Sequence, residues 1–172
     1  TDPLSQIELV RSQPDGTVSA FGMGEPGADI HVLATADDFA TYAVTPLSVG
    51  GAKGRRKKYE PLLLDVPHIS PPYCYRCPAT DHDGCGERYA AELERAILDA
   101  GAGRVAAFIA EPVIASVGGA IAPPDDYFPL VREICDRYGV LLIVDEVVTG
   151  FGRTGTPFAI DRWGVVPDMI AM

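Results

Sequence analysis

Two short apolar runs on either side of an amphipathic segment constrain the fold of this chain most. Val105–Ala110 and Val140–Val144 are continuous apolar runs, which is typical of buried strands. Between them, the apolar residues of 125–138 recur at the spacing of one helix face, and Gly139 ends the pattern. A strand, a helix and a second strand of these lengths predict a right-handed βαβ unit with parallel strands. We therefore expect an α/β fold, with Val105–Ala110 covered on both faces of its sheet.

The N-terminal part of the chain has a different pattern. Residues 7–12 and 17–21 predict two strands, and Asp15-Gly16 between them favours a tight turn. We expect residues 1–29 to form an atypical N-terminal segment that contains a β-hairpin. Residues 61–86 are rich in proline and hold three of the four cysteines, so they predict a long irregular connection.

The charge of the chain excludes one class of partner. With 14 Lys+Arg against 24 Asp+Glu, the net charge is −10. Binding to nucleic acid needs a basic surface, so no nucleic-acid partner is expected. The run Val140–Val144 is far shorter than the roughly 20 apolar residues of a membrane helix, and no membrane partner is expected either.

No signal-peptide pattern is visible, so the predicted location is cytoplasmic.

Two carboxylates follow the predicted parallel strands. Glu111 comes directly after the first strand and Asp145 directly after the second. Ligands of open α/β sheets bind at the carboxyl ends of the strands. A carboxylate next to an apolar strand is costly to bury unless a cation or donor meets it. Spacing alone leaves two interpretations of Asp145 open, a helix cap or a contact to a ligand or cofactor.

The cysteines raise the question of a metal site. Cys74, Cys77, His82 and Cys85 have residue types that suit tetrahedral Zn²⁺. A second Cys-x2-Cys pair is absent, so we expect no metal and keep zinc as the alternative. Cys135 lies on the apolar face of the predicted helix and is expected in the core.

Several segments together resemble one enzyme family. Leu141–Gly155, followed by Trp163–Asp168, is similar to the signature of class III aminotransferases, the fold-type-I enzymes that use pyridoxal 5′-phosphate (PLP). Further segments match the same family in the same order: Tyr59–Leu63, Tyr73–Pro78, and Ala110–Val113 with Gly118 and Gly119. The similarity covers roughly residues 47–172. It implies a partial three-layer α/β/α sandwich around a mainly parallel sheet, with residues 30–172 forming part of the PLP-binding large domain.

The resemblance also implies a set of cofactor-binding residues. Asp145 would pair with the pyridine nitrogen of PLP and hold it protonated, which lets the ring accept electrons from the substrate. Val148 stands where relatives place a residue against the ring, often Gln, and valine cannot hydrogen-bond there. Phe39 is the candidate for stacking on the ring, although the usual Tyr-His-Gly run is absent. Glu111 matches a glutamate near the active site of relatives.

One residue that the family chemistry needs is missing. Relatives hold PLP as a Schiff base on a lysine that follows the Val-Pro-Asp strand by a few residues. The last lysine of this sequence is Lys58, so the catalytic lysine is expected just beyond Met172. The family's phosphate-binding loop also has no counterpart between Thr1 and Ile30.

These observations lead to two functional hypotheses. The first is a piece of a homodimeric aminotransferase that moves an amino group between an amine or amino acid and a 2-oxo acid. As it stands, this chain is expected to be inactive. The alternative is a non-catalytic binding or interaction module that retains half of the fold. A stop codon directly after the codon for Met172, with a stable product, would contradict the first hypothesis.

Overall fold

The computed structural model describes residues 7–12, 17–22, 33–35, 47–76, 84–115 and 118–172. The chain divides into two compact units, Thr1–His68 and Ile69–Met172. The division falls between His68 and Ile69, whereas the sequence suggested a boundary after residue 29, and that boundary stays a prediction.

The first unit contains a small antiparallel sheet. Strands β1 (Ile7–Ser12) and β2 (Thr17–Gly22) pair antiparallel, and β3 (Leu33–Thr35) pairs antiparallel with β2. The two strands predicted around Asp15-Gly16 are therefore present, while the turn itself lies outside the described residues. The same unit holds a short helix, α2 (Lys53–Arg56), and the 3-10 helix η2 (Glu60–Leu62).

The second unit is built on a parallel sheet. Strands β4 (Ala107–Ala110), β5 (Leu141–Asp145) and β6 (Met169–Ala171) lie in the order β4-β5-β6, and both neighbouring pairs are parallel. Helix α4 (Tyr127–Tyr138) lies between β4 and β5 in the chain. The predicted strand–helix–strand unit with parallel strands is confirmed.

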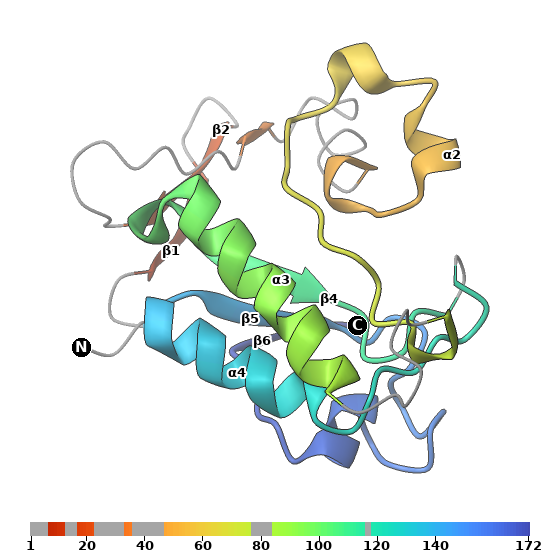
Figure 1. Cartoon of the computed structure of the whole chain (residues 1–172). Helices are drawn as coiled ribbons and strands as arrows, with labels where there is room; N and C mark the ends of the chain where they lie inside the picture. The colour runs from red at the N-terminus through yellow and green to blue at the C-terminus, as the bar shows by residue number, and fades with distance from the viewer. Residues whose placement is uncertain (1–6, 13–16, 23–32, 36–46, 77–83, 116–117) are drawn as a thin grey trace. The chain divides into compact units, whose positions relative to one another are not determined.

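Helices α3 (Cys85–Ala100) and α4 pack against each other beside this sheet (Figure 1). Gly139 ends α4 in the left-handed conformation, with φ +66°, and the amide of Val140 then donates to the carbonyl of Cys135 at 2.9 Å. This is the glycine-terminated helix end that the sequence predicts. The helices bury apolar side chains against β5 in one core, formed mainly by Tyr89, Leu93, Ile97, Tyr127, Phe128, Val131, Ile134, Cys135, Leu142 and Val144.

The two faces of the sheet differ in burial. Leu142 and Val144 point into the core with α3 and α4 and are fully buried. The alternate residues of the sheet lie on the other face, where Ile109 pairs in register with Ile143, and Ile143 with Met169. The side chains of Ile109 and Met169 are 40% and 39% exposed. Contrary to expectation, residues 105–110 are not covered on both faces within the part of the chain that the structure describes.

Short 3-10 helices complete the second unit: η3 (Cys74–Arg76), η4 (Ala102–Arg104) and η5 (Ala159–Trp163). Trp163 of η5 packs its ring against Phe128 and donates its indole N–H to the carbonyl of Pro124 at 3.3 Å. Within the described residues, no helix has the length and apolar character needed to cross a membrane.

Candidate functional site

The carboxyl edge of the parallel sheet brings the two predicted carboxylates to neighbouring strand ends. Asp145 is the last residue of β5, and Glu111 directly follows β4. The strands pair with Ala110 opposite Val144, so the two acidic residues leave the sheet side by side. Sequence reasoning placed both at this edge because each follows an apolar run.

One of the two carboxylate oxygens of Asp145 accepts a hydrogen bond from the backbone. Its Oδ1 accepts the backbone N–H of Val147 at 3.0 Å. No donor among the described residues reaches Oδ2, and no ion pair involves this carboxylate there. The side chain is half-buried. A carboxylate fixed by a backbone donor, with its second oxygen available, can accept a proton-bearing nitrogen of a ligand.

A depression lies directly after Asp145 in the chain. It has a volume of about 580 Å³ and is lined by Val147, Val148 and the loop 150–153. Val148 is 47% exposed and Phe151 is 80% exposed, so apolar surface faces solvent at this edge. Phe151 has a φ of +57°, a value that bulky residues rarely adopt. Such backbone strain is concentrated at ligand sites in proteins.

Glu111 is engaged within its own loop. Its Oε2 accepts the backbone N–H of Ala115 at 3.1 Å. The same loop is closed by a bridge between Ile114 and Ile121. No arginine forms an ion pair with Glu111 in the described part of the chain. Phe39, the proposed stacking residue, lies outside the described residues.

The acidic residue next to Asp145, which was not predicted as a site residue, is fully buried. Glu146 is 0% exposed. Its carboxylate accepts the hydroxyl of Thr149 and, at 2.9 Å, the backbone N–H of Ile160. The sequence did contain a signal for this burial. Successive side chains of a strand point to opposite faces, so if Asp145 faces away from the core, Glu146 must point into it.

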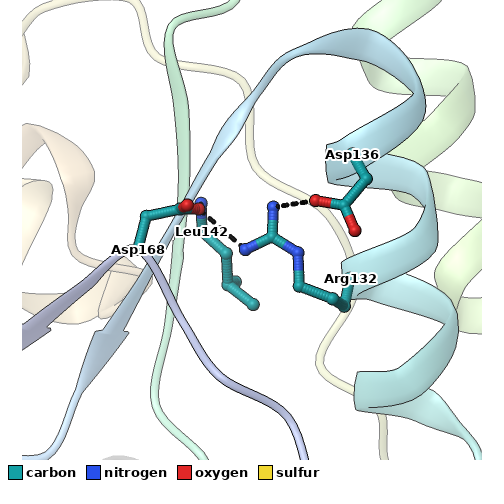
Figure 2. A network of polar contacts seen from close by, with 4 residues as sticks. All are labelled: Arg132, Asp136, Leu142 and Asp168. Atoms are coloured by element: carbon teal, nitrogen blue, oxygen red, sulfur yellow. Dashed lines mark hydrogen bonds and ion pairs between the residues drawn. The ribbon is translucent and has the colours of Figure 1, made fainter. Parts of the chain in front are cut away.

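A second polar network lies at the opposite end of β5 (Figure 2). Oδ2 of Asp168 accepts both Nη1 of Arg132 and the backbone N–H of Leu142, each at 2.7 Å. Arg132 also pairs through Nη2 with Asp136 at 2.7 Å. Burial lowers the pKa of Arg132, but the hydrogen bond and charge of Asp168 outweigh it and the net shift is upward. Asp168 therefore joins β6 to β5 and to α4.

The zinc alternative depends in part on residues outside the described part of the chain. No group of three metal-ligating side chains occurs among the described residues, but Cys77 and His82 lie outside them. Cys135 is fully buried in the core, as expected. Burial raises the pKa of its thiol to about 11.

The known proteins that resemble this chain all belong to one kind of enzyme, the aminotransferases. Residues 23–172 match the family described as Aminotransferase class-III. The chain is 43% identical over 128 residues to adenosylmethionine-8-amino-7-oxononanoate aminotransferase of Geobacter sulfurreducens, covering 73% of this chain and 28% of that protein. It is 42% identical over 128 residues to putrescine–pyruvate aminotransferase of Pseudomonas aeruginosa, covering 74% and 28%.

A solved structure agrees with these sequences. The omega transaminase from Pseudomonas jessenii in complex with PMP matches with a TM-score of 0.65 and 36% identity, over 74% of this chain and 29% of that one. The chain thus spans less than a third of the length of each of these three proteins. The α/β fold, the parallel sheet and the ordered motifs agree with the match over residues 23–172. The chain belongs to the class III aminotransferase family.

Proposed function

We propose that this chain supplies the aspartate side of a PLP site in an enzyme that transfers an amino group between an amine or amino acid and a 2-oxo acid. The observation that carries the proposal is the geometry of Asp145. One oxygen of its carboxylate is held by the amide of Val147, and the other meets no donor among the described residues. The carboxylate also stands at the carboxyl edge of a parallel sheet, and the residues that follow it in the chain line an open depression.

The residues present fit one end of PLP. A pyridine nitrogen that carries a proton needs an anionic acceptor, and Oδ2 of Asp145 is such an acceptor. The neighbouring depression is lined by Val147, Val148 and Phe151, which offer apolar surface to an aromatic ring. Class III aminotransferases use PLP, and a structural relative of this chain is described in complex with PMP.

Each residue has a distinct role in this proposal. When bound, PLP supplies an electron sink for the electrons released as the substrate loses its Cα proton. Asp145 holds the proton on the ring nitrogen, and the amide of Val147 orients the carboxylate. Val148 packs on the ring without hydrogen-bonding to it. Glu111, bonded to the amide of Ala115, lies at the neighbouring strand end and borders the site.

The covalent half of the site is not among these residues. No lysine follows Lys58 in the sequence. We propose that PLP binds this chain weakly and without covalent attachment, and that amino transfer requires a lysine that this part of the large domain does not supply.

The proposed substrates and partners follow the family. The Pseudomonas aeruginosa relative is named for putrescine and pyruvate, an amine and a 2-oxo acid, which supports these two substrate classes. A homodimer and a cytoplasmic location remain part of the proposal.

PLP titration of the purified chain tests the proposal. We expect a change in PLP absorbance that saturates as PLP is added. The affinity for PLP should fall at least about tenfold in Asp145→Asn and should not change in Asp99→Asn, on the exposed face of α3. Borohydride should yield no stable adduct. A reduced adduct mapped to one lysine would contradict non-covalent binding, and equal affinity of the two variants would favour the binding-module alternative.

A further inference from the structure

Glu146 stands at the junction of several segments around the proposed site. It follows Asp145, and its side chain is completely buried. Because successive side chains at a strand end point to opposite sides, Asp145 faces the open side of the sheet and Glu146 faces the core. Buried carboxylates are uncommon in proteins, so the contacts of Glu146 need a reason.

Glu146 is tied to the fold at four points. Its backbone N–H donates to the carbonyl of Ala171 in β6 at 2.8 Å, and its carbonyl accepts the amide of Gly150 at 2.8 Å. Its side chain accepts the hydroxyl of Thr149 through Oε2 and the amide of Ile160 through Oε1, the latter at 2.9 Å. Ile160 belongs to η5 and is itself 1% exposed in the core.

These bonds determine the shape of the turn that follows Asp145. The Gly150 amide closes the turn over residues 146–150, and the Thr149 hydroxyl holds its far side to the same glutamate. Val147 lies inside this turn and donates its amide to Oδ1 of Asp145. The direction of that amide therefore depends on the conformation that Glu146 stabilises. The Ile160 contact ties the turn to η5, whose Ile160 lies buried in the core.

We propose that Glu146 is a positioning residue for Asp145. Its buried carboxylate fixes the 146–150 turn, so that the Val147 amide holds Oδ1 of Asp145 and leaves Oδ2 aimed at the cofactor. It acts through hydrogen bonds rather than through its charge. The statement about the cofactor rests on the proposed function, whereas the statement about the turn stands on the contacts of this chain alone.

The first arm of the test needs no cofactor. Hydrogen exchange at the Val147 amide is compared among the native chain, Glu146→Gln, Glu146→Leu and Thr149→Val. Glutamine can still accept from Ile160 and hydrogen-bond to Thr149, so we expect exchange within about twofold of the native rate. Leucine keeps the volume but loses both side-chain bonds, and exchange should accelerate roughly tenfold or more. Unchanged exchange in both Glu146→Leu and Thr149→Val would overturn the proposal.

Two controls separate positioning from general destabilisation. Thr154→Val removes an exposed hydroxyl from the following loop and should leave Val147 exchange unchanged. Exchange at Leu93, in the middle of α3, should stay at the native rate in Glu146→Leu. If Glu146→Leu does not fold, Thr149→Val carries the test, because it deletes a single hydroxyl with little change of shape.

The second arm uses PLP and a double-mutant cycle. Glu146→Leu should weaken PLP binding roughly tenfold in the native background and by less than about twofold in Asp145→Asn, because its effect passes through Asp145. Glu146→Gln should restore native affinity. If Glu146→Leu lowered the affinity for PLP equally in the native and Asp145→Asn backgrounds, its role would be merely structural, and the proposal would be overturned. A native chain that binds no PLP would refute the proposed function and the cofactor statement, while the exchange arm would still decide the role of Glu146 in the turn.

Discussion

Oδ2 of Asp168 lies 2.7 Å from Nη1 of Arg132 and 2.7 Å from the backbone nitrogen of Leu142 (Figure 2). The amide of Asp168 in turn donates to the carbonyl of Leu142 at 2.9 Å. One carboxylate thereby sets the position of β6 beside β5 and ties both strands to α4. Asp145 stands at the other end of β5, so the register of the strand pair at its carboxyl edge depends on this contact.

Replacing Asp168 by alanine should therefore destabilise the fold. The change leaves the guanidinium of Arg132, whose side chain is 18% exposed, without its main partner and removes the acceptor for the Leu142 amide. Loss of one partner of a largely buried ion pair costs about 3 kcal/mol. Urea unfolding measures this change, with Asp99→Ala on the exposed surface of α3 as the control. A change in unfolding free energy no larger than that of the control would contradict the structural role assigned to Asp168.

The turn after Asp145 should tolerate no side chain at residue 150. A Cβ atom built at Gly150 would lie 2.9 Å from the carbonyl oxygen of Glu146, which is backbone and has to move. We expect Gly150→Ala to lower the free energy of unfolding by about 1–3 kcal/mol. Gly103→Ala is the matched control, because a Cβ there meets no atom within 4 Å. Equal stability of the two variants in thermal or urea unfolding would show that the turn adapts.

The contact between α3 and α4 should weaken in acid. Tyr138 and Arg137 both donate to Oε1 of Glu94, at 2.8 and 2.6 Å. The hydrogen bond from Tyr138 and the charge of Arg137 hold the pKa of Glu94 below its usual value of 4.5. A carboxyl group whose pKa is lower in the folded state stabilises the fold above the unfolded-state pKa and loses this contribution as pH falls through the folded-state value.

Unfolding of Glu94→Gln measured between pH 3 and pH 7 checks this dependence. The difference in stability from the native chain should be largest near pH 7 and shrink below about pH 4.5. Glu133→Gln, on the exposed side of α4, should show no such dependence. A Glu94→Gln difference that stays constant over the whole range would exclude the proposed protonation effect.

Apolar periodicity was enough to predict the parts of the fold that follow from local pattern. The spacing of apolar residues located α4, and the two apolar runs located β4 and β5 to within two residues. The carboxyl-edge positions of Asp145 and Glu111 then followed from strand direction. A run such as 105–110 does not reveal whether both faces of the strand are covered, because apolar side chains occur on either face, and the open face of β4 was not foreseen.

Polar contacts between distant segments were not predictable in the same way. Glu146 meets Ile160 fourteen positions away, and Asp168 meets Arg132 thirty-six positions away. Neither pair shows a periodic signal, since each depends on how η5 and β6 return to β5. The sequence gives only weaker indications of these contacts. An acidic residue follows Asp145 at a position whose side chain points to the core, and an aspartate directly precedes the short apolar strand β6.

Val148 gives a direct test of the proposed ring position. Relatives often carry Gln there, and a Gln side chain can donate to the phenolic oxygen of the cofactor, which valine cannot do. We expect Val148→Gln to tighten PLP binding about threefold to tenfold, as one added hydrogen bond of about 1 kcal/mol would. The matched control is Val166→Gln, outside the depression, where the native side chain is 82% exposed. Equal affinities of the two variants in a PLP titration would place the ring elsewhere, because only a residue beside its phenolic oxygen gains a partner from the added amide.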